Sequence, residues 1–192
     1  MRKAKINKED ILNATIQLVG DIGLENVTTK KVAAHCGISE GSVFNYYQSK
    51  KNLLTQCLYH IDQQIDNVLQ QVPISPAELM PSVQGLWFTY FEYLVSHGDY
   101  AKYYRAFRHS SYYTEEVVAG QDQSFTYFSK LLRSNVPMLP FNINIMWVYI
   151  IETTLNFAIR IADGTLPYGE NESENGIYFK LLMTGVTGIL TP

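Results

Sequence analysis

The sequence predicts an all-α protein: an N-terminal three-helix helix-turn-helix domain followed by a C-terminal helical domain, about nine helices in all. Apolar residues recur at helical spacing almost throughout, and no run alternates with the two-residue period of a strand. Three short helical segments with tight breaks lie near the N-terminus, which is typical of a helix-turn-helix. Apolar residues make up 46% of the 192 residues, enough to build a substantial core.

The N-terminal helices are expected from local start and stop signals. The first has an apolar face from Ile11 to Ile22, and Gly23 follows it as a stop. The second runs through Ala34 and ends at Gly37, the third runs to about Tyr46, and the fourth runs to about Gln71. Ser and Thr are favoured helix N-caps because their hydroxyls accept from free backbone N–H groups. The expected caps are Thr28 or Thr29, Ser39 and Ser49.

The remaining helices follow a linker with two prolines, Val72–Pro76. The expected domains are therefore residues 1–50 and 72–192, with the fourth helix, about 50–71, connecting them. The helix at 142–163 is apolar on nearly every face, so we expect it to be deeply buried or sandwiched between other elements. The other expected helices cover residues 77–96, 100–107, 117–132 and 176–190.

Charge is distributed unevenly along a chain whose net charge is −3. Residues 1–51 hold eight Lys or Arg and five Asp or Glu, whereas the remainder holds seven and thirteen. The basic end can face phosphates while the acidic body points away from them. No signal peptide and no uninterrupted apolar run of membrane-spanning length is found, so we expect a soluble cytoplasmic protein without a membrane partner.

The residue pattern argues against an enzyme. The four histidines show no metal-ligand spacing, and no Ser/His/Asp or Cys/His pairing is indicated. Cys36 and Cys57 suggest neither a disulfide framework nor a zinc site. We therefore expect no catalytic residue, no metal and no cofactor.

Residues 23–54 closely resemble the DNA-binding signature of the TetR family of transcriptional regulators. The match covers about a quarter of the chain. The features that carry it are Gly23, Thr28, Val32-Ala33, the turn Cys36-Gly37-Ile38-Ser39, Gly41, the aromatic run Phe44–Tyr47, and Lys50 followed by Leu53-Leu54.

The resemblance implies that the third helix enters the major groove of DNA. Gly41 allows a close approach of the backbone, and base edges are expected to be read by Ser42, Asn45 and Tyr46. Helix N-termini suit phosphate oxygens, because their free N–H groups carry partial positive charge. The expected phosphate contacts are Thr28, Thr29, Lys30, Ser39 and Lys50, although Thr28 and Ser39 can also be simple caps and Lys30 a solvated charge.

One position departs from the family pattern. Many relatives have a tyrosine where this chain has Phe44, and its hydroxyl contacts a phosphate. That contact is either lost here or supplied by Tyr46. Tyr47 is expected to be a core residue.

The resemblance also implies that the C-terminal helices bind a small-molecule effector. The aromatic stripes can line such a pocket, or they can be plain core. Glu152 interrupts the most apolar helix, and a buried carboxylate needs a partner. Arg105, Arg108 or Arg160 can supply one, or else a cationic ligand held partly by cation–π attraction. The candidate ligand-binding residues are Trp87, Phe91, Tyr103, Tyr104, Phe107, Phe125, Phe128, Tyr149, Glu152 and Asn156.

The implied function is that of a ligand-responsive repressor. A homodimer, paired through the last two helices, would bind a palindromic operator in double-stranded DNA and leave it when a small, aromatic or apolar molecule binds. Gly185 and Gly188 would allow close approach of those helices, in the dimer or within one subunit. Two alternatives stay open: a DNA-binding regulator without an effector, and an activator of the same fold.

Overall fold

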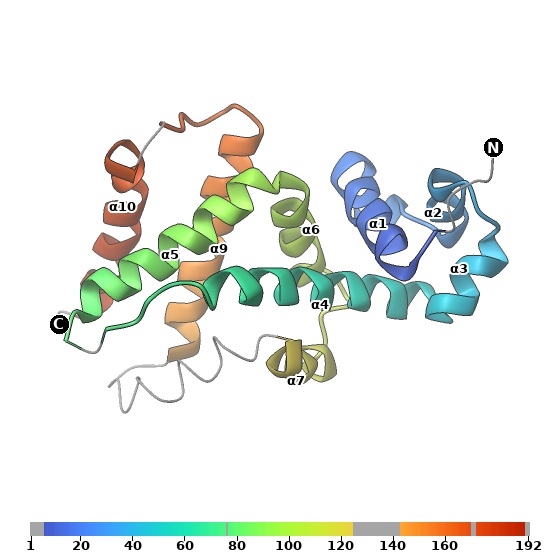
Figure 1. Ribbon diagram of the computed structural model, residues 1–192, viewed down its shortest axis with the longest axis horizontal. Coiled ribbons are helices and arrows are strands. Elements are labelled where there is room, and N and C mark those ends of the chain that lie inside the picture. The colour runs from blue at the N-terminus through green and yellow to red at the C-terminus, as the bar shows by residue number, and fades with distance from the viewer. Residues whose placement is uncertain (1–5, 76, 125–142, 170–171, 191–192) are drawn as a thin grey trace. The chain divides into compact units, whose positions relative to one another are not determined.

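The computed structural model describes residues 6–75, 77–124, 143–169 and 172–190, and every regular element in these ranges is a helix (Figure 1). Nine α-helices and one short 3-10 helix are described, which confirms the all-α prediction. The chain forms two compact units. The first comprises Met1–Gln64 and Lys102–Ser124, and the second comprises Ile65–Ala101 and Phe125–Pro192. The expected domain boundaries near residues 50 and 72 stay a prediction.

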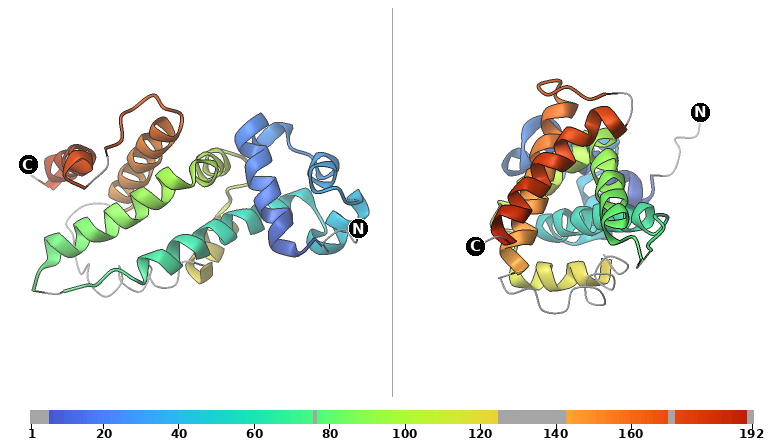
Figure 2. Two further views of the ribbon diagram at one scale, coloured as in Figure 1. Left: turned by 45° about the horizontal axis from the view of Figure 1, so that its top comes forward. Right: turned by 90° about the vertical axis from the view of Figure 1, so that its left-hand side faces the viewer.

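The helices of the N-terminal head are close to those expected. Helix α1 packs on α2, and α2 packs on α3, in the first unit (Figures 1 and 2). The long helix α4 then begins in this unit and ends in the second. The bounds are α1 Lys8–Ile22, η1 Leu24–Asn26, α2 Thr29–Cys36, α3 Glu40–Tyr47 and α4 Lys50–Leu69.

Local hydrogen bonds explain where these helices begin and end. The hydroxyls of Thr28, Ser39 and Ser49 accept from the backbone N–H of Lys31, Ser42 and Asn52, at 3.2, 3.1 and 3.1 Å. Helix α2 ends at Gly37, whose φ of 65° and ψ of 32° are left-handed. All three expected caps are confirmed, with Thr28 rather than Thr29 serving α2.

Helices α6 (Gly98–Arg108) and α7 (Glu115–Ser124) complete the first unit from residue 102 onward. The fully buried Tyr103 donates a hydrogen bond of 2.6 Å from its hydroxyl to the backbone carbonyl of Leu54 in α4. On α7, the backbone at Gly120 lies so close to the hydroxyl of Tyr59 that an added Cβ would be only 2.0 Å away. The segment 102–124 is thus packed directly on the first part of α4.

A buried polar network joins the same three helices. The carboxylate of Asp62, on α4, is fully buried and accepts from the hydroxyl of Tyr104 at 2.9 Å and the amide of Gln121 at 3.0 Å. Gln121 accepts in turn from the hydroxyl of Tyr113 at 2.9 Å. Buried polar groups of this kind are stabilising only when they are satisfied, so the network fixes one arrangement of α4, α6 and α7.

The second unit is built on helices α5 (Leu79–Ser96), α9 (Ile143–Ala162) and α10 (Glu172–Leu190), which pack on one another. In its core the indole of Trp87 donates a hydrogen bond of 2.9 Å to the hydroxyl of Thr154 and stacks on Phe91. On α10, Gly185 faces Tyr149 of α9, because an added Cβ would lie 2.0 Å from that hydroxyl. Gly185 therefore serves helix packing within the subunit.

Helix α9 differs from the sequence expectation, because it is not deeply buried. Ile145 is 62% exposed and Val148 is 52% exposed. By length and hydropathy its stretch Ile145–Ala162 could cross a membrane, but only 28% of that stretch is buried and a single such helix is weak evidence. The apolar composition of this helix predicts burial within one chain, whereas the side of α9 that carries Ile145 and Val148 is left uncovered.

The other differences are at helix ends. Helix α10 begins earlier than expected, at Glu172, and the side chain of Asn175 in its first turn bonds the backbone of Gly169 at both N–H and C=O. Gly98 begins α6 instead of ending α5, which ends at Ser96. The expected helix at 117–132 is described only as far as Ser124, and residue 142, where the next helix is expected to begin, lies outside the described residues.

Candidate nucleic-acid interface

Helix α3 is anchored through one face and leaves the opposite face free. Val43 and Tyr47 are buried against the head, at 1% and 4% exposure. The hydroxyl of Tyr47 donates a hydrogen bond of 2.6 Å to the carbonyl of Lys8 at the start of α1, and burial raises the pKa of this tyrosine. At 100° per residue, Gly41 and Asn45 lie opposite the buried pair, and both are exposed. The helix thus turns a small residue and an amide outward.

No contact among the described residues requires a glycine at position 41. A Cβ added to Gly41 would meet its nearest neighbour, the hydroxyl of Ser39, at an ordinary 3.8 Å. An exposed residue without a side chain, beside Asn45 on the outer face, is what close approach of a foreign surface needs.

The hydroxyls at the two helix N-termini already have partners. Thr28 caps α2, and Ser39 caps α3 and shares a second hydrogen bond of 2.8 Å with the hydroxyl of Ser42. Thr29 donates a hydrogen bond of 2.6 Å to the carboxylate of Glu40, which links the first residue of α2 to the first residue of α3. Lys30, the next residue, is exposed.

The remaining expected phosphate contact, Lys50, is at the start of α4. Lys50 is half-buried, and its ammonium lies 5.8 Å from the centre of the Tyr112 ring. The neighbouring Lys51 is exposed and pairs with Glu116 at 3.9 Å. The two lysines therefore differ, since one is held over an aromatic face and the other is a solvated surface pair.

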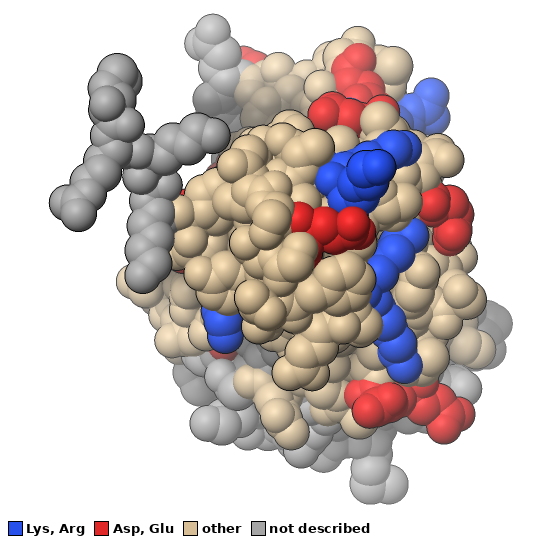
Figure 3. Space-filling view, turned by 90° about the vertical axis from the view of Figure 1, so that its right-hand side faces the viewer, with Lys and Arg blue, Asp and Glu red and all other residues tan. Residues whose placement is uncertain are grey.

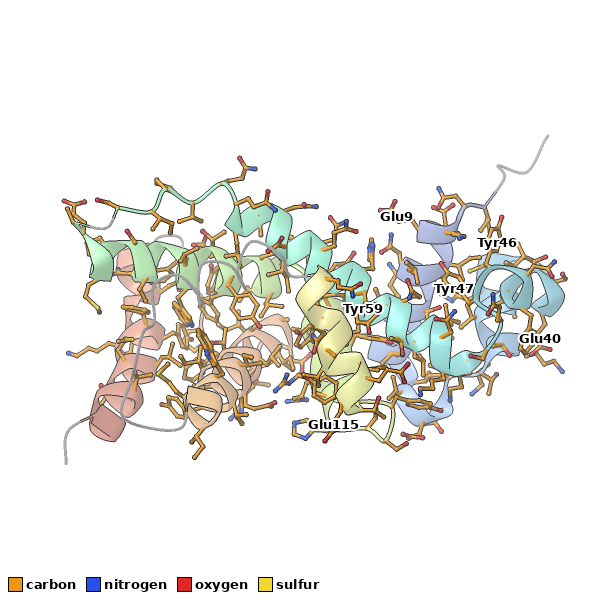
Figure 4. The ribbon with its side chains drawn as sticks, turned by 90° about the horizontal axis from the view of Figure 1, so that it is seen from below. Glu9, Glu40, Tyr46, Tyr47, Tyr59 and Glu115 are labelled. Atoms are coloured by element: carbon orange, nitrogen blue, oxygen red, sulfur yellow. The ribbon has the colours of Figure 1, made fainter. Side chains whose placement is uncertain are left out.

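The three aromatic residues of α3 differ in their exposure to solvent. Phe44 is 44% exposed, an unusual value for a large apolar side chain. Tyr46 is half-buried, with its ring centre 6.4 Å from that of Tyr47. Tyr47 is buried, as expected. Figure 4 labels Tyr46 and Tyr47 on α3, near Glu40.

The face of the head that carries α2 and α3 mixes both signs of charge. Lys and Arg side chains lie on it in separate groups, and Asp and Glu side chains lie between and beside them (Figure 3). A surface of this kind can approach a polyanion only in particular registers, because carboxylates and phosphates repel each other.

The candidate ligand residues fall into both units. Trp87, Phe91, Tyr149, Glu152 and Asn156 belong to the second unit, and Tyr103, Tyr104 and Phe107 to the first. Five of the eight are buried, Tyr149 and Glu152 are half-buried and Asn156 is exposed. Phe125 and Phe128 lie outside the described residues.

An open groove of about 420 Å³ lies in the second unit, against α5. Thr89, Tyr93 and Tyr168 are among its lining residues, and none of the candidate ligand residues is. The groove borders the aromatic core, because the ring of Tyr168 packs edge-on with that of Phe91, with their centres 6.1 Å apart.

Two residues of the head were missed by sequence reasoning. The expected DNA contacts do not include Glu40, although an acidic residue in the first turn of the expected recognition helix is a visible signal. Tyr112 lies far from Lys50 in the sequence, and no local pattern links them. Glu40 could therefore have been found from the sequence, whereas the contact of Tyr112 with Lys50 could not.

A helix-turn-helix head followed by a helical body defines the class of all-α helix-turn-helix proteins. Within that class, residues 11–57 match the family model described as bacterial regulatory proteins, tetR family. The segment 11–57 is thus similar to the tetR family of bacterial regulatory proteins.

Curated relatives match less than half of this chain. The HTH-type transcriptional regulator BetI of Proteus mirabilis is 27% identical over 60 residues, 31% of this chain and 30% of that protein. BetI of Escherichia coli O45:K1 is 27% identical over 78 residues, 38% of this chain and 40% of that protein. The matches thus span well under half of these relatives.

Solved structures match along most of the chain. A TetR family transcription regulator from Marinobacter aquaeolei VT8 has a TM-score of 0.73 at 18% identity, over 91% of this chain and 92% of that one. One from Shewanella sp. PV-4 has a TM-score of 0.74 at 18% identity, over 94% and 98%. The transcriptional regulator FadR of Bacillus subtilis, solved in complex with stearoyl-CoA, has a TM-score of 0.60 at 12% identity, over 83% and 95%. These likenesses establish the fold.

Proposed function

We propose that this protein is a ligand-responsive repressor, acting in the cytoplasm as a homodimer that binds a palindromic DNA operator through α3. The observation that carries DNA binding is the outward face of α3, where exposed Gly41 and Asn45 lie opposite the anchoring pair Val43 and Tyr47. An Asn side chain can pair with adenine N6 and N7 in the major groove, which is worth roughly 1–3 kcal/mol of discrimination. We assign phosphate contacts to Lys30, Lys50 and the N-termini of α2 and α4.

The uncovered apolar side chains of α9 and α10 support dimerisation. Ile145 and Val148 on α9 are joined by Ile177 and Leu181 on α10, which are 52% and 50% exposed. Large apolar groups left in water on two neighbouring helices favour burial against a second copy. Two helices from each subunit would form a four-helix bundle about a two-fold axis, and the two heads would read successive major grooves about 34–36 Å apart.

A small-molecule effector is the second half of the proposal. The aromatic residues of the C-terminal helices fit an aromatic or apolar ligand, and a protein of the same fold, FadR of Bacillus subtilis, is solved with stearoyl-CoA. Such a ligand acts only if it binds the state that cannot bind DNA more tightly than the state that can.

Selection from a pool of random DNA tests the DNA-binding half. The wild-type protein is expected to enrich an inverted repeat, and Asn45→Ala is expected to keep the repeat while relaxing one base position in each half. Binding of all sequences alike, with no repeat, would overturn the proposal. A promoter carrying the selected operator would then separate a repressor from an activator in a transcription assay.

Ultracentrifugation tests the dimer. Leu181→Glu on α10 is expected to yield monomers with weakened operator binding, because it places a charge in the proposed interface. Met80→Glu is the matched control, since Met80 is an apolar side chain on α5 that is 53% exposed. Equal effects of the two variants would contradict the assignment of the interface to α9 and α10.

Titration of candidate effectors into the protein–operator complex tests the ligand-responsive half. Aromatic and acyl compounds that bind the free protein are expected to weaken operator binding. If every compound that binds leaves operator affinity unchanged at saturation, the alternative of a regulator without such an effector is favoured.

A further inference from the structure

Glu40 and Thr29 form a hydrogen bond that ties the two helices of the helix-turn-helix together. The hydroxyl of Thr29, at the start of α2, lies 2.6 Å from one carboxylate oxygen of Glu40, at the start of α3. A hydroxyl-to-carboxylate bond of this length is of the strong, charge-assisted kind. Glu40 itself is exposed at the end of the head (Figure 4). The carboxylate is therefore held in place on the surface that we assign to DNA.

Capping of α3 does not explain the position of this carboxylate. Ser39 already accepts from the backbone N–H of Ser42, and the hydroxyls of these two serines bond each other. Glu40 gains some stabilisation from the helix dipole, but an acid free in the first turn would gain the same. Its specific partner is the hydroxyl of another helix. On a surface meant for a polyanion, a fixed negative charge is costly unless it meets a donor.

Major-groove chemistry offers few donors. A carboxylate can only accept, and it is repelled by the acceptors N7 and O6 of guanine and O4 of thymine. Adenine presents the N6 donor beside the acceptor N7, whereas cytosine presents its N4 amino group without a neighbouring acceptor on the same base. Of the four bases, cytosine is the one that a fixed carboxylate prefers.

We propose that Glu40 is a specificity-determining residue that selects cytosine at one position of each half-site, and that Thr29 is the positioning residue that holds its carboxylate. This inference rests on the proposed DNA-binding function. The hydroxyl of Thr29 has one hydrogen, and it is donated to Glu40. Phosphate oxygens accept and cannot donate, so only the backbone N–H of Thr29 is left to contact a phosphate.

Base preference in a randomised half-site tests the inference, using the full-length protein and deep sequencing of the bound DNA. Wild type is expected to prefer cytosine at one position by on the order of tenfold. Glu40→Ala is expected to lose that preference and keep the others. Glu40→Gln is expected to shift it toward adenine, because a Gln amide can both donate to N7 and accept from N6. Thr29→Val is expected to weaken the cytosine preference without abolishing binding.

Glu25→Ala is the matched control, because Glu25 is an exposed acid in η1, before α2 begins. It should leave the preference profile unchanged. If Glu40→Ala and Glu40→Gln both bind all sequences more tightly by one common factor, Glu40 only repels phosphate and the inference is overturned. Glu40→Gln retains an acceptor for Thr29, so it keeps the test decisive should Glu40→Ala fail to fold.

The wild-type result distinguishes a failure of this inference from a failure of the proposed DNA-binding function on which it rests. An enriched operator whose profile is the same in wild type and both Glu40 variants overturns the inference alone. A wild-type protein that enriches no sequence overturns the proposed function, and the inference with it.

Discussion

The ammonium of Lys50 lies 5.8 Å from the centre of the Tyr112 ring, at the point where α4 begins. A cation at a helix N-terminus is disfavoured by the helix dipole, and the negative face of an aromatic ring offsets this cost. Tyr112 lies in the loop between α6 and α7, within the same first unit as Lys50. The residue that we assign to a DNA phosphate is therefore held by a ring from a distant part of the chain.

Lysines 50 and 51 are expected to differ in their effect on DNA binding. Lys50→Ala should weaken binding to all sequences alike, and the slope of log K against log salt should fall in magnitude by about 0.9, the value for one phosphate contact. Lys51→Ala is the control, because this exposed lysine pairs with Glu116. Fluorescence anisotropy at several salt concentrations gives both slopes. A change of base preference in Lys50→Ala would contradict the role assigned to it.

The Tyr112 ring is expected to compete with phosphate for Lys50. Tyr112→Leu removes the aromatic face but keeps an apolar side chain, and a cation–π contact at such a site is worth about 0.5–1 kcal/mol. Operator affinity should therefore rise by at most about two- to fivefold, which is the fold-change that corresponds to this energy. The double variant with Lys50→Ala should show no such gain. Weaker binding by Tyr112→Leu would mean that the ring orients the lysine for DNA.

Two glycines of α10 are expected to respond in opposite ways to alanine. A Cβ at Gly185 would lie 2.0 Å from the Tyr149 hydroxyl and 2.4 Å from the ring carbon that carries it, so the Tyr149 side chain or the helices must shift. Overpacking of this kind costs about 1–3 kcal/mol. A Cβ at Gly176 would meet nothing within 4 Å, so Gly176→Ala should stabilise the helix by up to about 1 kcal/mol. Urea unfolding at one protein concentration compares them, and equal effects would contradict the close α9–α10 contact.

Removal of one hydroxyl is expected to loosen the attachment of α6 to α4. Tyr103→Phe keeps the fully buried ring but deletes the hydrogen bond of 2.6 Å to the Leu54 carbonyl. A net loss of about 0.5–1.5 kcal/mol in the free energy of unfolding is expected. Tyr46→Phe is the matched control, since the hydroxyl of Tyr46 forms no hydrogen bond with any residue that the structure describes. A loss of similar size in both variants would show that the buried bond contributes nothing of its own.

The helices of the head were predictable because their signals are local. The hydroxyls of Thr28, Ser39 and Ser49 cap backbone groups three residues away, and Gly37 adopts the left-handed conformation that ends α2. Such interactions depend only on the order of residues over one turn of helix. The sequence by itself therefore determined the helix-turn-helix, its outward residue Asn45 and the core role of Tyr47.

The tertiary structure decided which distant groups meet. Periodicity places Tyr103 on an apolar stripe, but only the packing shows that its hydroxyl donates a hydrogen bond to the carbonyl of Leu54. The packing also shows that segment 102–124 belongs to the same unit as the N-terminal helices. Three other contacts likewise join residues of different elements: Thr29 with Glu40, Lys50 with Tyr112, and Gly185 with Tyr149. A helical pattern states which face is apolar and not what covers it, because that depends on contacts between residues far apart in the chain.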